Sequence, residues 1–177
     1  MTRPLLSLLA GCVSLSAILL MSGCSSGSDG GWSNSSTYDT SLRTIAVPVF
    51  GNATSDRKLS QNLTEAVVKE IESVTPWKVT GQGRADTILR GSVTRYRLIL
   101  LSKDPTTGLA NEMLVEATVD FEWVDLRTGE PILARAGFAA SALFTPSRPS
   151  QQPVDIGRFE VVQVLARDIV DTLQADW

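Results

Sequence analysis

Apolar side chains occupy every second position of residues 113–123, and this alternation constrains the fold more than any other feature of the sequence. The alternating apolar residues are Met113, Val115, Ala117, Val119, Phe121 and Trp123, and the charged residues that precede them or lie between them are Glu112, Glu116, Asp120 and Glu122. A period of two is typical of a strand with one face on a core and the other in water. The segment therefore predicts a half-buried antiparallel strand, which needs partner strands and a covering layer.

The flanking segments predict those partner strands. Residues 87–101 form a long β candidate in which the apolar phase changes: Leu89, Gly91 and Val93 share one face, whereas Tyr96, Leu98 and Leu100 fall on the other. A bulge or bend near Arg95 would reconcile the two phases. After a turn over residues 125–130, apolar alternation resumes from Ile132 to Ala140. These three segments predict an antiparallel meander.

Two helical patterns supply the covering layer. Residues 44–50 (TIAVPVF) predict a first strand, which residues 51–54 interrupt. Apolar residues then recur at helical spacing from Leu59 to Val74, and residues 77–80 form a short extended piece. A last helix carries its apolar stripe on Phe159, Val162, Ala166, Ile169 and Leu173. The order strand, helix, three strands, helix predicts an α+β fold with two helices on one face of a small, mostly antiparallel four-stranded sheet.

The N-terminus predicts an export signal. Arg3 precedes an uncharged, leucine-rich run from Leu5 to Met21, which is typical of a signal peptide and short for a transmembrane helix, the alternative interpretation. The run leads into Ser22-Gly23-Cys24, which resembles the lipobox of bacterial lipoproteins and implies lipidation at Cys24. Cys12 follows a similar motif, but the apolar stretch before it is shorter.

The sequence thus divides into three parts. Residues 1–23 are expected to be a lipoprotein signal peptide, 24–41 the lipidated cysteine and a Ser/Gly-rich flexible tether, and 42–177 a single α+β domain. Ser25 stands where the proteobacterial sorting pattern has aspartate for inner-membrane retention, which points to the outer membrane.

Composition excludes several classes of function. The chain has no histidine and a formal net charge of −3, and its two cysteines lie within the first 24 residues. Neither a histidine-based nucleophile pair nor a Cys/His metal site can be built in the body of the protein, and nucleic acid is an unfavourable partner. The Gly81-Gln82-Gly83 segment lacks the third glycine of a dinucleotide loop. We expect no enzyme activity, cofactor or metal, although carboxylates from distant segments leave a paired-carboxylate site open.

A basic cluster lies along residues 90–103 of this acidic chain: Arg90, Arg95, Arg97 and Lys103. One interpretation is ion pairing with the acidic neighbouring strand. The other is contact with phosphate groups of an anionic lipid, because the planar guanidinium matches phosphate oxygens. The sequence leaves both open.

Several segments together resemble the lipopolysaccharide-assembly lipoprotein family, LptE. They are Val47-Pro48-Val49-Phe50-Gly51-Asn52-Ala53-Thr54, the helix from Leu59, Ala85-Asp86 leading to Leu89-Arg90-Gly91, the segment Val124 to Glu130, and the helix that closes on Trp177. Other periplasmic lipoproteins share the Phe-x-Asn-x-Thr and Ala-Asp-x-x-Leu-x-Gly signatures. The resemblance covers residues 44–177.

The resemblance implies a lipoprotein on the inner leaflet of the outer membrane, which plugs the β-barrel partner LptD, assists its assembly and helps pass lipopolysaccharide to the cell surface. The basic cluster is our own candidate for contact with lipopolysaccharide. Two alternatives use a similar fold: a lipoprotein regulator of a peptidoglycan synthase, and a curli-type secretion lipoprotein.

Overall fold

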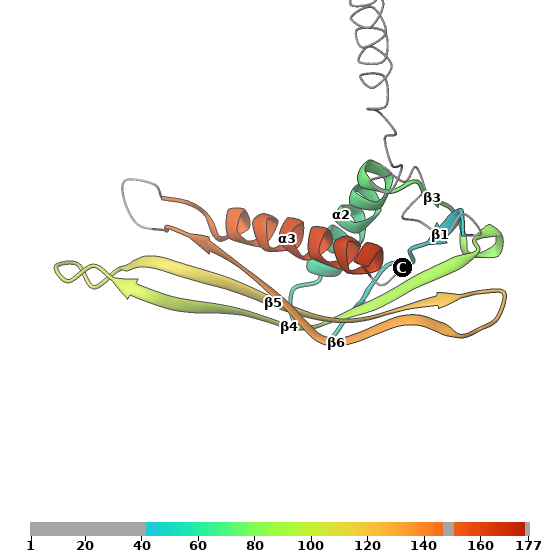
Figure 1. The fold of residues 1–177 in the computed structure, drawn as a ribbon. Coiled ribbons are helices and arrows are strands. Elements are labelled where there is room, and N and C mark those ends of the chain that lie inside the picture. Colours follow the sequence, from blue (N-terminus) through green and yellow to red (C-terminus); the bar gives the residue numbers. More distant parts are fainter. Residues whose placement is uncertain (1–41, 147–150, 176–177) are drawn as a thin grey trace, which may run out of the picture. The chain divides into compact units, whose positions relative to one another are not determined.

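The computed structural model describes residues 42–146 and 151–175. The expected signal peptide, Cys24 and the tether all lie outside the described residues. Within the described part, two helices cover one face of a long, curved sheet (Figure 1). The predicted α+β class is confirmed.

Three long strands form the main part of the sheet: β4 (Thr87–Lys103), β5 (Ala110–Asp125) and β6 (Pro131–Phe144). They pair antiparallel in sequence order, as the predicted meander requires. On the far side of β4, strand β1 (Thr44–Ala46) pairs with it in parallel, and β3 (Lys78–Val79) pairs in parallel with β1. A further short strand, β2 (Gly51–Asn52), also pairs with β4. Among residues 42–146 and 151–175 the sheet therefore has six strands, because two two-residue strands join the four that were predicted.

The helices follow the predicted apolar patterns. Helix α2 (Leu59–Val74) ends where Thr75 turns into an extended conformation before Pro76. The chain returns through β3 and a 3₁₀ turn, η1 (Gln82–Arg84), to the start of β4. Helix α3 (Val154–Ala175) packs on α2 and on strands β5 and β6. The two helices and the sheet thus enclose a single apolar layer.

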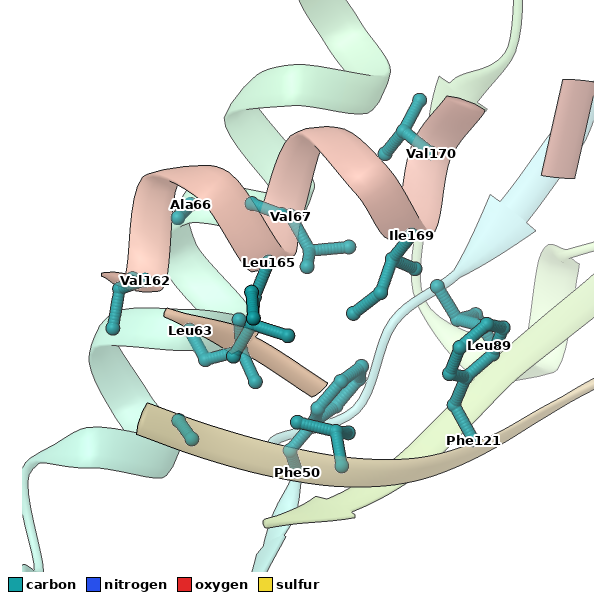
Figure 2. Packing of buried hydrophobic residues seen from close by; sticks show 14 of the residues in the cluster. Phe50, Leu63, Ala66, Val67, Leu89, Phe121, Val162, Leu165, Ile169 and Val170 are labelled. Carbon is teal, nitrogen blue, oxygen red and sulfur yellow. The ribbon is translucent and has the colours of Figure 1, made fainter. Parts of the chain in front are cut away.

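The core lies between the helices and the meander. From α3, Val162, Leu165 and Ile169 are at most 2% exposed. In Figure 2 they lie close to Leu63 and Val67 of α2, with Phe121 of β5 and Leu89 of β4 beneath them. At one end of this layer the rings of Trp77 and Trp123 pack at 5.1 Å between centroids. Burying side chains of this size supplies the main driving force for folding.

Two expectations need correction. The first strand ends at Ala46 instead of Phe50, because Pro48 has no N–H for a ladder and Val49 turns outward with 66% of its surface exposed. Residues 51 and 52, expected to interrupt the strand, instead pair with β4 as β2. The second correction is Phe159, which was placed on the buried stripe of the last helix but is 64% exposed.

Candidate functional site

A β-bulge in β4 places three arginines of the basic cluster on one face of the sheet. The register shifts between Val93 and Arg95, so that Thr94 is the extra residue, as the phase change predicted. Arg90 and Arg97 stand opposite Glu122 and Glu116 of β5, and Arg95 stands opposite Thr118. These partners alternate with the residues of β5 that pack in the core, so the three arginines share the face turned away from the helices.

Ion pairing divides the basic cluster into two pairs. Arg97 donates to Glu116 Oε1 from Nε at 2.8 Å and from Nη2 at 2.7 Å. The hydrogen bond and the charge of Glu116 raise the pKa of Arg97. Arg90 is paired more loosely, with 3.9 Å between its Nη1 and Glu122 Oε1. Cross-strand pairing, the first interpretation of the cluster, therefore holds for these two residues.

The other two cations have different surroundings. The side chains of Arg95 and Lys103 are exposed, and neither side chain makes a hydrogen bond or salt bridge to another described residue. Lys103 closes β4 opposite Ala110, at the end of the hairpin. An exposed cation without an internal partner keeps its charge and its hydrogen-bond donors for a ligand. Arg95 and Lys103 are therefore the members of the cluster best suited to meet an anion.

A shallow depression of about 470 Å³ lies beside Arg90 on the sheet. It is lined by Arg90, Ser92, Asp120, Glu122, Arg135 and Ala136, among others. A bulge in β6 shapes its rim: the backbone N–H of Gly137, which has a φ of 68°, donates to Asp120 Oδ1 at 2.7 Å. Cations and carboxylates alternate around this depression, so it carries no strong charge of either sign.

The end of the β4–β5 hairpin carries exposed apolar side chains that sequence reasoning did not single out. Leu98, Leu100, Leu101 and Leu109 are between 42% and 63% exposed. The hairpin end, at the left of Figure 1, extends past the helices. Alternation identified the faces of β4 correctly, but it holds no information on where the covering helix stops.

The motif residues that carry the family resemblance hold the fold together. Asp86 Oδ2 accepts hydrogen bonds from the backbone N–H groups of Arg43 and Thr44, both at 3.0 Å, and from Thr44 Oγ1 at 2.8 Å. These bonds, led by the one from the Thr44 hydroxyl, lower the pKa of Asp86. Asn52 Oδ1 accepts from the N–H and hydroxyl of Thr54, both at 2.8 Å.

Glycine is required at one of these motif positions by close packing. A Cβ on Gly91 would lie 2.8 Å from Cε2 of the buried Phe50.

In the turn after β5, Asp125 Oδ1 accepts from the backbone N–H of Arg127 at 2.7 Å, and Gly129 adopts a φ of 76°. These motifs therefore report a shared architecture and do not mark a catalytic site.

Within residues 42–146 and 151–175, no group of three or more His, Cys, Asp or Glu side chains is arranged to hold a metal ion. None of the helices in this same part of the chain has the length and apolarity needed to cross a membrane. The sheet face turned away from the helices carries charges of both signs.

The described residues thus form an α+β domain with two helices on one face of a mostly antiparallel sheet. The model of the lipopolysaccharide-assembly family, LptE, matches residues 42–176. The chain belongs to this family, whose members are non-catalytic assembly lipoproteins. Family membership points to a lipid-anchored location in the cell envelope.

Solved structures are similar to the chain at low sequence identity. Protein CT253 from Chlamydia trachomatis is 12% identical, with a TM-score of 0.52, over 75% of this chain and 96% of that one. Protein XCC0632 from Xanthomonas campestris is 10% identical, with a TM-score of 0.52, over 76% and 85% of the two chains. A minor lipoprotein from Acinetobacter baumannii is 19% identical, with a TM-score of 0.47, over 76% and 92%. No curated protein sequence matches the chain.

Proposed function

We propose that this protein is an outer-membrane lipoprotein of the lipopolysaccharide transport machinery, anchored through Cys24, which plugs the LptD β-barrel and assists its assembly. The observation that carries the proposal is the family match, which extends over residues 42–176 and so includes the whole described domain. In this role the protein binds and positions its partners, and it needs no cofactor, metal or catalytic group.

The geometry of the sheet supports a plug. β4 and β5 pair over almost their full lengths, and the helices stiffen one face of the meander. The opposite face alternates charges, with Arg97 paired to Glu116 and Arg90 near Glu122. A stiff body with a mixed-charge polar face fits a wide polar lumen, because both signs of charge find partners there.

The basic cluster is the proposed contact with lipopolysaccharide phosphates. Arg95 and Lys103 are free to bind, whereas Arg90 and Arg97 would have to share their donors with Glu122 and Glu116. We therefore assign the larger share of the contact to Arg95 and Lys103, with Arg90 and Arg97 orienting the sheet face around them.

Affinity purification of the full-length lipoprotein from its own envelope in mild detergent, followed by mass spectrometry, tests the proposal. Recovery of a large β-barrel in near-equal amount is the expected result. A Cys24→Ala variant is the control, since it should lose its membrane location. Recovery of a peptidoglycan synthase without any barrel, or of a ring containing this chain alone, would replace the proposal with one of the two alternatives.

A further inference from the structure

We propose that the second half of β6, Phe138–Phe144, is an interaction surface that pairs edge to edge with an extended strand of the partner protein. This inference rests on the proposed function only for the identity of the partner as an envelope β-barrel protein. The edge itself is defined by the topology, the sequence and the packing of β6.

β6 is an edge strand of the sheet. In the described part of the chain the strand order is β3-β1-β4-β5-β6, so β6 has a neighbouring strand on one side only. From Phe138 to Phe144 each residue pairs in unbroken register with β5, from Val119 to Met113. Among the described residues, the backbone groups of this half bond to β5 alone. Its outward N–H and C=O groups are therefore available to another strand.

The two halves of β6 differ in how their edge is protected. Proteins guard exposed edges with proline, charge and bulges. The first half has all three: Pro131, Arg135 and the bulge at Gly137. The second half reads FAASALF and has none of them. Protection that stops at Gly137 leaves one segment of seven residues open to strand addition.

This open half is held rigid from the inside. Ala140, Ala142 and Phe144 are at most 8% exposed. Phe144 packs against Gly157 of α3 so closely that a Cβ there would lie 2.8 Å from its Cδ1. A strand already fixed in its paired conformation loses little conformational entropy when a partner binds.

The rows of side chains that cross the sheet indicate which types of side chain the added strand has. On the face away from the helices, Ile99, Leu114 and Leu143 form one row that ends at the edge, where Leu143 is 49% exposed. The neighbouring row ends at Ser141. An incoming strand would continue the first row with an apolar side chain and the second with an uncharged polar one.

Size favours a strand of a partner protein over a second copy of this chain. Seven residues give an edge about 24 Å long and about 10 Å thick. The area of such an edge is far below the roughly 800 Å² per partner that a stable interface needs. A partner protein that is already held nearby presents its strand to this edge at a raised effective concentration, so a small contact is enough for binding. Two free copies of this chain do not have that advantage.

Site-specific photo-crosslinking in the full-length lipoprotein in its native envelope tests the inference. A photoreactive residue replaces Ser141 or Leu143 in turn, and one at Ala134, exposed in the protected half of the same strand, is the matched control. We expect crosslinks to one segment of a β-barrel protein from positions 141 and 143, and at least fivefold fewer from position 134.

Lysine substitutions provide a second measurement. Ser141→Lys and Leu143→Lys place a charge on the open edge, and we expect both to reduce recovery of the barrel severalfold while Ala134→Lys leaves it unchanged. All three side chains are exposed, so circular dichroism and the unfolding midpoint should match those of the unmodified protein.

The outcomes separate this inference from the proposed function. Recovery of the barrel without edge crosslinks overturns the inference and leaves the function standing. Edge crosslinks to a different envelope protein support strand pairing at this edge and overturn the proposed function. Crosslinks between two copies of this chain overturn the choice of partner.

Discussion

The carboxylate of Asp86 accepts a hydrogen bond from the Thr44 hydroxyl across 42 residues of sequence, with 2.8 Å between Oδ2 and Oγ1. The Asp86 N–H donates back to Thr44 Oγ1 at 2.9 Å. The same oxygen of Asp86 also accepts from the backbone of Arg43 and Thr44. This pair of residues ties the first strand of the domain to the start of β4.

Replacing Asp86 with asparagine should destabilise the domain by about 1–2 kcal/mol at neutral pH, because hydrogen bonds to a carboxylate are stronger than those to an amide. The pKa of Asp86 is lowered in the folded state, so its ionised form contributes stability above the unfolded pKa of about 3.9. That contribution is lost as the pH falls through the folded pKa. Denaturant unfolding of both proteins at pH 7 and pH 3 measures the difference, which should shrink at the lower pH. Asp171→Asn, which replaces an exposed carboxylate on α3, is the control.

Replacing Gly91 with alanine should destabilise the domain by about 1–3 kcal/mol, because the added methyl group would overlap the ring of Phe50. Gly83→Ala is the matched control, since a Cβ there meets nothing within 4 Å. In the double variant Gly91→Ala/Phe50→Leu the smaller side chain makes room for the methyl group. Its loss of stability should therefore be smaller than the sum of the losses in the two single variants. Strict additivity in denaturant unfolding would contradict the packing argument.

Arg158 on α3 forms ion pairs with two carboxylates, and the two pairs should contribute different amounts to the stability of the fold. Its Nε lies 2.8 Å from Asp56 Oδ2, in the loop before α2, and its Nη1 lies 2.7 Å from Asp155 Oδ1 on its own helix. The Asp56 side chain is 17% exposed and that of Asp155 is 73% exposed. Burial lowers the pKa of Arg158, but its polar and charged neighbours, the Asp56 carboxylate among them, outweigh burial and raise the pKa overall.

A double-mutant cycle compares the two pairs. We expect a coupling of about 1 kcal/mol between Arg158→Ala and Asp56→Asn, because the half-buried pair is less screened by water. The pair with Asp155 should give about 0.3 kcal/mol, the usual value for an exposed pair within one helix. Equal couplings would show that burial does not strengthen the pair between Arg158 and Asp56.

Replacing Arg95 and Lys103 together with alanine should weaken lipopolysaccharide binding roughly tenfold, because two exposed charge contacts of about 0.7 kcal/mol each amount to one factor of ten. Arg84→Ala removes an exposed cation from the 3₁₀ turn outside the hairpin and should change binding little. Isothermal titration at low and physiological salt measures the effect, which should be larger at low salt. Unchanged binding by the folded double variant would remove these residues from the proposed site.

Cys24 lies outside the described residues, and its lipidation stays a prediction. Growth with labelled palmitate should label the wild-type protein and Cys12→Ser, but not Cys24→Ser. The reverse pattern would move the anchor to Cys12. Labelling of neither cysteine variant would mean that both are needed for processing.

The sequence alone determined the class of the fold and much of its detail. Alternation from Met113 to Trp123 identified the central strand, the phase change around Arg95 located the bulge, and helical spacing located α2 and most of the buried stripe of α3. These features are local, because each depends on the direction in which a residue points from its own strand or helix. The pairing of Arg90 with the acidic strand could also be predicted from the sequence, since opposite charges on neighbouring strands face each other.

Only the tertiary structure decided which of those faces are covered. Phe159 lies on the predicted stripe of α3 yet is 64% exposed, and Leu98 falls on the helix-facing side of β4 yet is 47% exposed. The division of the basic cluster and the position of β6 at the sheet edge likewise depend on strand order and register. Periodicity tells which way a side chain points, but burial requires another element on that side, and its placement is set by contacts between residues far apart in the sequence.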